Sequence, residues 1–572
     1  MTLQVSVRSN LYKDSVALMR IAEEVRAATG VARATLLMGT EANKAILEQA
    51  GLFSDALRAA RAADLMVLVE DADDHDGSRV AAALQLAERL LAGKAAASQP
   101  GVQQMSPQSM AMAVAAANEA GNKSGLAQIS VPGAYAAAEA LKAIKAGLDV
   151  FLFSDNVPLE QELAIKQLAQ AHGRLVMGPD CGTAIVGGVP LGFANQVRRG
   201  RIGLVGASGT GLQEVSCQIH ALGEGVSHAL GTGGRDPSAA IGGISLHAAM
   251  EMLAADASTE VIVLISKPPA ALVVQSLNAR MQQLAAQTGK HFVVLFLGAP
   301  PSAALPGITP VGTLFEAAAQ AVALVQGKGK GRADTATRVG AAESVNVAAL
   351  PKPLDNAQNS SQNSAQNSAQ HSPQQRYVRG LFSGGTFCTE AQAIWQAHGL
   401  RCWSNVPLDK SLLLSDARCS QEHTAVDLGD DVFTVGRPHP MIDPQLRIER
   451  LLAEAADPTV AVILLDVVLG WGSHADPAGA LAPAIRQACA IASADGRALS
   501  VIGFVTGTAD DPQNLAAQRE CLLQAGVTLA DSSSAAAMMV LALLAQLAAV
   551  APSQSALNPA SPKAERSKAV VS

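Results

Sequence analysis

The order of apolar and polar positions predicts alternating strands and helices over the first 326 residues. Short apolar runs are typical of buried strands, and segments with apolar residues at helical spacing follow them. The strands are expected at residues 3–7, 34–39, 65–70, 127–133, 149–154, 174–178, 201–206, 261–266 and 292–298. Helices are expected between them, one of them over residues 159–171. Strand–helix–strand order favours right-handed parallel units and therefore an α/β class.

Two polar segments divide the chain. Residues 327–376 contain the run NAQNSSQNSAQNSAQHSPQQ and almost nothing that could form a core. Such a Gln/Asn/Ser tract is either a flexible tether or a functional segment with a tendency to aggregate, and its place between apolar blocks favours a tether. Residues 551–572 have the same character and are expected to be disordered.

The apolar pattern returns after the first polar segment, with strands predicted at residues 378–384, 460–468 and 499–505. A glycine-rich turn occurs in both halves with the same spacing. Its residues are Gly209, Thr210, Glu214 and Gly223 in the first half and Gly385, Thr386, Glu390 and Gly399 in the second. Residues 250–266 also resemble residues 449–465 in their order of helix, polar turn and buried strand. We interpret this as a duplication, although two unrelated α/β units remain an alternative.

These boundaries predict four folded units. Residues 1–98 form a small α+β domain, residues 99–198 a Rossmann-like unit, and residues 199–326 and 377–550 two similar α/β domains. The composition agrees, because 49% of residues are apolar, 16% are charged and only 3% are aromatic. That mixture is typical of helices packed on buried parallel strands.

Charge and cysteine content exclude several classes of function. The net charge of −7 provides no basic field for nucleic acid or for an anionic membrane. No apolar run reaches the length of a membrane span, and the N-terminus has no apolar signal core. The seven cysteines contain no C-x-x-C pair, and the histidines show no metal-ligand spacing. We therefore expect a cytoplasmic protein with reduced thiols, no metal site, no nucleic-acid partner and no membrane partner.

The duplicated turn is the main candidate for chemistry. A glycine-rich turn between a buried strand and a helix lets an anion approach the free N–H groups of the helix start. The candidate anion- or substrate-binding residues are Ser208, Gly209, Thr210, Glu214, Ser383, Gly384, Gly385, Thr386 and Glu390. The alternative interpretation is tight packing with ordinary helix capping, which two copies make less attractive.

Further candidates lie in two loops that follow these turns. Residues 230–243 contain Gly233, Gly234 and Arg235, and the arginine fork suits a carboxylate or a phosphate. Asp236 would orient that arginine or bind a cation, although a turn aspartate before proline is the more ordinary role. In the second half, Arg437, His439 and Asp443 fall close together. His439 is the best titratable candidate, and a loop histidine held by hydrogen bonds is its alternative role.

Two strand ends add weaker candidates. Asp180 and Cys181 follow a buried strand, where open parallel sheets bind ligands. Asp180 is expected to orient a substrate, whereas Cys181 has no identifiable base beside it and is expected to be an inert packed thiol. Lys267 also follows a strand, and a surface role and a functional role are equally compatible with it.

Residues 129–162, 174–185 and 200–215 resemble the CoA-binding and ligase domains of succinyl-CoA synthetase α-subunits. Within that superfamily, VRSNLYKDSV, GTGGRDP, LISKPP and DPQNLAAQ resemble the FdrA-like proteins. The resemblance covers nearly everything outside the linker and the tail. It implies a CoA-binding-type Rossmann domain over residues 99–198 and two flavodoxin-like, ligase-type domains with parallel sheets over residues 199–326 and 377–550.

The resemblance has two departures. The synthetases carry a histidine that becomes phosphorylated, and residues 296–318, where it would lie, contain no histidine. Their CoA-binding domain begins with a glycine-rich phosphate loop, and residues 112–125 are not such a loop. CoA, a nucleotide and Mg²⁺ are the cofactors that the resemblance makes conceivable, and the residues themselves identify none.

FdrA-like proteins are associated with oxamate carbamoyltransferase, a multi-subunit enzyme of allantoin breakdown that converts oxalurate and phosphate into oxamate and carbamoyl phosphate. This resemblance implies a small anionic substrate, phosphate and further subunits as partners. It also implies that the two turns hold oxyanions while Arg235 or Arg437 clamps the substrate carboxylate and His439 assists catalysis. An acyl-CoA synthetase and a non-catalytic scaffold subunit are the alternatives.

Overall fold

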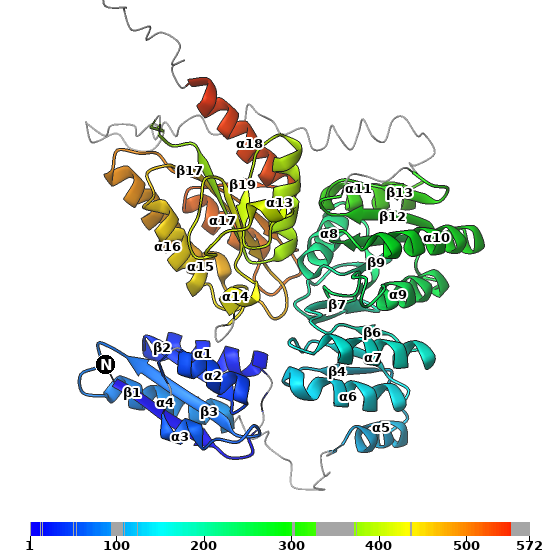
Figure 1. The fold of residues 1–572 in the computed structure, drawn as a ribbon, viewed down its shortest axis with the longest axis horizontal. Coiled ribbons are helices and arrows are strands. Elements are labelled where there is room, and N and C mark those ends of the chain that lie inside the picture. The colour runs from blue at the N-terminus through cyan, green and yellow to red at the C-terminus, as the bar shows by residue number, and fades with distance from the viewer. Residues whose placement is uncertain are drawn as a thin grey trace, which may run out of the picture.

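The computed structural model describes residues 2–92, 107–299, 304–327, 371–434 and 438–550, apart from positions 12, 14, 50, 53, 108, 123 and 373. These residues form sheets of three, three, seven and six strands. Most of the predicted linker and all of the predicted tail lie outside the described residues. In Figure 1 the two three-stranded units lie below the two larger ones.

The N-terminal unit is the small α+β domain that the sequence predicts. Its central strand β3 runs antiparallel to β1 and to β2. Leu65, Val67 and Val69 of β3 pack on one face, while Met66 and Leu68 pack on the other. The two faces are covered by different helices, so this strand is apolar along its whole buried length. The elements are β1 (Thr2–Arg8), α1 (Ser15–Thr29), β2 (Arg33–Met38), α2 (Glu41–Gln49), α3 (Asp55–Arg58), β3 (Leu65–Asp71) and α4 (Ser78–Ala92).

The second unit is a small parallel sheet in the order β4-β5-β6. Helices α6 and α7 connect its strands, as the strand–helix–strand pattern predicts. Helix α7 has the bounds expected from the sequence. The elements are α5 (Met110–Glu119), β4 (Leu126–Ile129), α6 (Gly133–Lys145), β5 (Asp149–Leu152), α7 (Leu159–Ala171) and β6 (Val176–Met177).

The first repeat unit is built on a seven-stranded sheet in the order β13-β12-β11-β9-β10-β7-β8. Its core strands are parallel, and the hairpin β7–β8 joins β10 in antiparallel orientation. The strands are β7 (Thr183–Val186), β8 (Val189–Gly192), β9 (Arg199–Gly206), β10 (Val226–Gly231), β11 (Val261–Ser266), β12 (His291–Phe296) and β13 (Ile308–Pro310). The helices are α8 (Gly209–Ala221), α9 (Ile244–Ala255), α10 (Ala271–Thr288) and α11 (Leu314–Val325).

The second repeat unit has a fully parallel six-stranded sheet in the order β15-β16-β14-β17-β18-β19. The strands are β14 (Tyr377–Phe382), β15 (Trp403–Ser404), β16 (Thr424–Asp427), β17 (Val460–Val468), β18 (Ser500–Thr506) and β19 (Val527–Ala530). The helices are α13 (Gly385–Ala397), η3 (Lys410–Leu412), α14 (Asp431–Thr434), α15 (Gln445–Ala455), α16 (Pro477–Ala494), α17 (Leu515–Gln524) and α18 (Ser533–Val550).

The two repeat units share one strand order. Reading each sheet from the edge, β13-β12-β11-β9-β10 corresponds to β19-β18-β17-β14-β16. In both units the helix with the glycine-rich turn follows the central strand, namely α8 after β9 and α13 after β14. The shared order supports the duplication, and the fold is the parallel α/β class that the sequence predicts.

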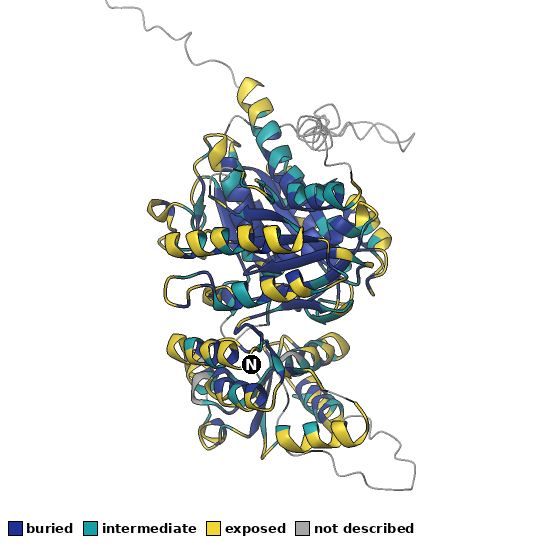
Figure 2. Ribbon diagram, turned by 90° about the vertical axis from the view of Figure 1, so that its right-hand side faces the viewer, coloured by how far each residue is buried: buried dark blue, intermediate teal, exposed yellow. Residues whose placement is uncertain are grey.

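The repeat units join through their first and last helices. Helix α8 lies beside α13, and one apolar core cluster contains residues of both units, including Leu212, Phe387 and Trp395 (Figure 1). Figure 2 shows the strands of the two repeat units in dark blue, with exposed residues on the outward faces of the helices. Burial on both sides explains why the strands are nearly continuous apolar runs. Among the described helices, none combines the length and apolar character that a membrane crossing requires.

Candidate functional site

The two glycine-rich turns meet at the contact between the repeat units. The side-chain hydroxyls of Ser208 and Thr386 lie 2.7 Å apart and share a hydrogen bond. Both residues are buried. We call the starts of α8 and α13, residues 208–210 and 384–386, the helix junction. The sequence predicts each turn separately, and their meeting is a property of the fold.

Glycine makes this close approach possible. A Cβ atom on Gly384 would overlap the side chain of Thr210, and a Cβ on Gly211 would lie 3.1 Å from Cγ2 of Thr386. Contacts this short leave no room for a side chain without displacing the neighbour. Gly384 therefore lets the two helix starts touch, which is a packing role in addition to any contact with a ligand.

The first backbone amides of both helices remain available. Among the described residues, no hydrogen bond is made by the N–H groups of Gly209 and Thr210 in α8, or of Gly385 and Thr386 in α13. Gly209 and Gly385 keep partial exposure to solvent. Four unpaired donors at two helix N-termini create a positive potential that favours an anion.

Charged side chains border the α13 start. Asp427, at the end of β16, is buried, and its Oδ1 accepts a hydrogen bond of 3.0 Å from Gly429 N. Its Oδ2 lies 2.5 Å from the position that a Cβ on Gly385 would take, and Nζ of Lys267 lies 3.5 Å from the same position. Lys267 follows β11 of the other repeat unit and is exposed. Lys267 is among the candidates expected from the sequence. Asp427 is not, because the short strand that it ends carries too weak an apolar signal.

Ser383 is held by a buried ion pair. Its N–H donates to Oδ1 of Asp466 over 2.9 Å, and its hydroxyl donates to Oδ2 of the same residue. Arg447 of α15 forms an ion pair with Asp466, with Nη2 at 3.2 Å from Oδ1. These contacts occupy the Ser383 side chain, so Ser383 fixes the shape of the turn.

His439 lies next to the junction in a neutral state. Its Nε2 lies 2.7 Å from the position that a Cβ on Gly429 would take, and its ring packs on Phe193 with centroids 5.7 Å apart. Its Nδ1 accepts a weak bond of 3.3 Å from Met441 N. Burial and the nearby Arg447 lower the pKa of His439 to about 4. The imidazole is therefore uncharged at neutral pH and can donate only from Nε2. Arg437, the other candidate of this loop, lies outside the described residues.

Glu214 and Glu390 serve the contact between the repeat units. Glu214 of α8 accepts from Thr506 and from Ser533 N of the second unit, over 2.5 and 3.4 Å. Glu390 of α13 accepts from Leu314 N of the first unit over 2.8 Å and from the Ser533 hydroxyl over 2.5 Å. Each carboxylate thus reaches the last helix of the opposite unit. This corrects the expectation that these glutamates bind the substrate, because a buried carboxylate engaged in this way also repels an anion.

The loop that carries Arg235 begins beside the α8 turn, where Thr232 N donates to the Gly206 carbonyl over 2.9 Å. Arg235 forms an ion pair of 2.8 Å with Glu162 and donates to the Val157 carbonyl over 2.7 Å. Asp236 is fully buried, pairs with Lys166 at 2.8 Å and caps α9 through Ser245 N and Leu246 N. These bonds tie the second unit to the first repeat unit. The expected clamp on a substrate carboxylate is therefore replaced by an internal ion pair.

Three further candidates, Gly233, Gly234 and Asp180, lie in or beside that loop. A Cβ on Gly233 would overlap the Pro179 carbonyl, and its φ of +82° favours glycine, whereas Gly234 faces open space. Asp180 keeps an exposed edge. Desolvation by the surrounding protein and the charges of Asp155 and Asp431 raise the pKa of Asp180 to about 7, against the opposite effect of Arg235.

Cys181 is a packed thiol, as expected. It is buried and donates to the Thr183 carbonyl over 3.4 Å. Burial raises the pKa of Cys181 to about 12, which leaves the thiol protonated and unreactive. Over the described ranges, no group of three or more His, Cys, Asp or Glu side chains could hold a metal ion.

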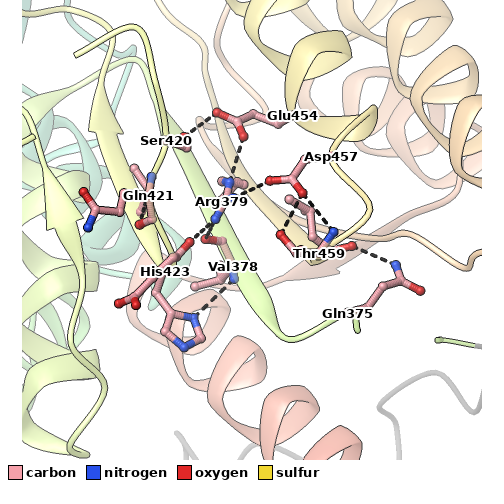
Figure 3. A network of polar contacts seen from close by, with 12 residues as sticks. Gln375, Val378, Arg379, Ser420, Gln421, His423, Glu454, Asp457 and Thr459 are labelled. Atoms are coloured by element: carbon pink, nitrogen blue, oxygen red, sulfur yellow. Dashed lines mark hydrogen bonds and ion pairs between the residues drawn. The ribbon is translucent and has the colours of Figure 1, made fainter. Parts of the chain in front are cut away.

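An ion network closes the opposite end of β14. Figure 3 shows Arg379 between Glu454 and Asp457, at 2.7 and 2.8 Å, while Gln375 donates to the Val460 carbonyl over 2.7 Å. Through Gln375, the network anchors the segment that leads into β14. Because it lies at the amino end of a parallel sheet, away from the helix junction, we assign it a structural role.

Three family models match the chain. The model for the CoA binding domain matches residues 197–296, and the model for the CoA-ligase matches residues 381–543. The model described as "AllF, heavy metal-associated domain" matches residues 1–108, a segment without cysteine. The CoA binding domain model thus falls on the first repeat unit, and the CoA-ligase model falls on the second. The chain is an acyl-CoA-synthetase-like protein with CoA-binding and CoA-ligase domains.

The chain also matches solved structures at low identity and low TM-score. The chain is similar to a dinucleotide-forming acetyl-coenzyme A synthetase from Candidatus Korarchaeum cryptofilum, with 16% identity, a TM-score of 0.26, and 76% of this chain and 85% of that one covered. It is also similar to ATP citrate lyase from Methanothrix soehngenii, with 16% identity, a TM-score of 0.27, and 41% and 37% covered.

Sequence relatives are more informative. The succinate–CoA ligase α-subunit of Aquifex aeolicus is 32% identical over 148 residues, which is 24% of this chain and 46% of that protein. The uncharacterized protein YahF of Escherichia coli K12 is 42% identical over 543 residues, covering 93% of this chain and 97% of YahF. The match to YahF runs through all four units. This chain therefore belongs to the same family as YahF, the FdrA-like proteins of the succinyl-CoA synthetase α-subunit-like superfamily.

Proposed function

We propose that this chain is a subunit of an acyl-CoA-synthetase-like enzyme. At the helix junction, phosphate attacks the carbonyl carbon of an acyl group and displaces the group bound to that carbon. The observation that carries the proposal is the meeting of two helix starts whose first amides are unpaired and partly exposed. Phosphate attack on an acyl carbon places negative charge on both the phosphate and the acyl oxygen. Two sets of preorganised N–H donors suit these two charges.

The donor of the acyl group has two candidate classes. A thioester is favoured by the CoA-binding and CoA-ligase family models and by the succinate–CoA ligase relative. A carbamoyl donor such as oxalurate is favoured by residues 296–318, which lack a histidine that could relay the phosphoryl group. Direct attack by phosphate needs no such relay. In the second case the products are carbamoyl phosphate and oxamate, as the FdrA-like resemblance implies.

The first strand–helix turn of the second unit is packed against other backbone, because a Cβ on Gly133 would overlap the carbonyl of Asp155. The described side chains form no ligand set for a metal ion. We therefore route no step through CoA, a nucleotide or Mg²⁺ in this chain. Further subunits of a hetero-oligomeric complex are the proposed source of any such binding.

The proposal is tested by two assays on the purified chain, alone and with subunits encoded nearby. One assay measures carbamoyl phosphate from oxalurate and phosphate, and the other measures acyl phosphate from acyl-CoA and phosphate. A carboxylate at the junction should repel the attacking anion, so Gly209→Asp should lower either activity by about 100-fold. Aspartate is tolerated in a first helical turn, but a Cβ on Gly209 would lie 3.2 Å from Oγ1 of Thr183, so thermal melting of the variant must show that it keeps the fold.

The matched control is Ala516→Asp, which adds the same charge to the exposed first turn of α17. It should retain full activity. Full activity of Gly209→Asp would show that the transfer does not occur at the helix junction. Absence of both activities with every set of subunits would favour a scaffold role.

A further inference from the structure

Asp427 is a buried carboxylate with one oxygen left unused. Its backbone is clamped by Asn405, which donates to the Asp427 carbonyl and accepts from its N–H, both over 3.0 Å. Its Oδ1 is engaged by Gly429 N. Within the described part of the chain, Oδ2 makes no hydrogen bond or ion pair, although the residue is only 7% exposed. That oxygen points at Gly385, the partly exposed first residue of α13.

Two further groups face the same place from other elements. Lys267 reaches it from the end of β11, with Nζ bordering Gly385, and it has no ion pair among the described side chains. His439 reaches it from its loop, because its Nε2 and the Asp427 Oδ1 both border Gly429, at 2.7 and 3.3 Å from its Cβ position. An acid, a cation and a neutral imidazole thus converge from three separate segments.

The register shows that this acid is specific to the second repeat unit. Phe382, three residues before the start of α13, pairs with Asp427 in the neighbouring strand. The corresponding residue before α8 is Gly206, which pairs with Gly231 on one side and Ile265 on the other. The α8 start therefore faces no carboxylate from its flanking strands. Both helix starts offer unpaired amides to an anion, and an acid–base group is available only beside the α13 start.

We propose that Asp427 transfers the proton during phosphate-dependent acyl transfer, and that Lys267 anchors an oxyanion of the reacting pair. The inference rests on the proposed function and assigns its acid–base residue. Hydrogen phosphate attacks the acyl carbon and its O–H proton passes to Oδ2 of Asp427. The new C–O bond forms as the bond from carbon to the leaving sulfur or nitrogen breaks. The proton then passes from Asp427 to that leaving atom, which balances the reaction.

The surroundings of Asp427 suit this task. Burial raises the pKa of Asp427 to about 6, Lys267 and the Gly429 N–H oppose the shift, and the charges of Asp430 and Asp466 add to it. Asp466 is paired with Arg447, and His439 is uncharged at neutral pH. A group with a pKa close to the working pH can both accept and return a proton.

The decisive variants change the charge at or around Asp427. Asp427→Asn should lower kcat by roughly 100-fold or more, which is the usual contribution of general acid–base catalysis. Asp430→Asn removes a neighbouring negative charge and should move the acid limb of the pH–rate profile to lower pH. Lys267→Met removes a positive charge and should move that limb to higher pH. Glu520→Gln, on the exposed face of α17, is the control and should leave the profile unchanged.

A second measurement needs no turnover. Sulfate is a tetrahedral dianion that does not titrate near neutral pH, so its binding to the full chain by calorimetry reports only on protein groups. Sulfate affinity should fall as pH rises through about 6, because Asp427 becomes charged. Asp427→Asn should abolish this pH dependence, and Lys267→Met should weaken sulfate binding by about tenfold at every pH.

The outcomes separate the two proposals. If Asp427→Asn keeps the wild-type kcat, pH profile and sulfate dependence while Gly209→Asp is inactive, the junction is the site and Asp427 is not its acid–base group. If Gly209→Asp is fully active, the proposed function at the junction fails and the role of Asp427 fails with it. Both proposals are supported if Asp427→Asn folds but is inactive, and if Asp430→Asn and Lys267→Met shift the acid limb of the pH–rate profile in opposite directions.

Discussion

The two glycine-rich turns have the same backbone and different neighbours. Both follow a central strand, start a helix of the same length and present unpaired amides to one junction. The strands beside the α8 turn provide Gly231 and Ile265, whereas those beside the α13 turn provide Asp427 and Asp466. Duplication thus preserved the geometry of the turns while their electrostatics diverged. Both turns are suited to bind one anion through their amides, and only the α13 turn also has a group suited to move a proton.

A second comparison concerns features that did not diverge. Glu214 and Glu390 occupy the same position in their helices, and each binds the last helix of the opposite unit. This exchange is reciprocal, as expected for units that pack about an approximate two-fold axis. The duplicated glutamates therefore explain how the turns are held together, and they take no part in the chemistry.

The largest effect is expected from a substitution that disrupts the contact between the two glycine-rich turns. Gly384→Ala should destabilise the protein by about 1–3 kcal/mol, because the new methyl group overlaps Thr210. Adding Thr210→Ala should recover most of the loss. Chemical denaturation of the two single variants and the double variant measures the coupling. Gly125→Ala, where a Cβ meets nothing within 4 Å, should be neutral. Equal losses at positions 384 and 125 would contradict the close contact.

Arg235→Ala tests whether Arg235 is an internal ion-pair partner or a substrate clamp. We expect a loss of about 1–2 kcal/mol in stability, because Glu162 is fully buried and keeps only Lys166 as its partner. The KM for the anionic substrate should stay within about twofold, because Glu162 and the Val157 carbonyl already engage the Arg235 side chain. A large rise in KM with unchanged stability would show that Arg235 binds the substrate carboxylate.

Part of this picture could be predicted from the sequence. The buried strands 261–266 and 460–468 and the helix 159–171 have the predicted bounds, because long apolar or periodic runs are strong signals. The strand β16 was missed because only four residues form it, and with it the role of Asp427. Neither the meeting of residues 208 and 386 nor the pairing of Arg235 with Glu162 has a local signal, since both depend on how distant segments pack.

Glu214→Gln tests the contact between the repeat units through pH. Burial raises the pKa of Glu214, with hydrogen bonds from Thr506 and Gln218 acting in the opposite direction. The folded-state pKa lies above the unfolded one, so the wild type should lose stability as pH rises through the folded-state pKa. The glutamine variant should lose less, giving a difference on the order of 1 kcal/mol at pH 8 that vanishes at pH 4. Parallel stability curves for the two proteins would contradict this.

Asp180→Asn should give the smallest effect. Because its pKa of about 7 lies above the ordinary value of an aspartate, the wild type should lose stability steadily between about pH 4 and pH 7. The loss should be small, because the Asp180 residue is exposed and solvent screens its charge. Asparagine tolerates the left-handed backbone at this position, where φ is +54°. Thermal melting should show a flatter pH dependence for the variant. Activity should be unchanged, and a loss of activity would bring Asp180 back into the site.

The account depends on the two turns forming one anion site, and tungstate in crystals of the full chain tests this directly. Tungstate is a tetrahedral dianion that anomalous scattering locates without ambiguity. We predict one tungstate per chain, bound by the amides of Gly209 and Gly385 at the helix junction. Tungstate bound beside Arg235 with an empty junction, or two separate ions on the two turns, would contradict the account.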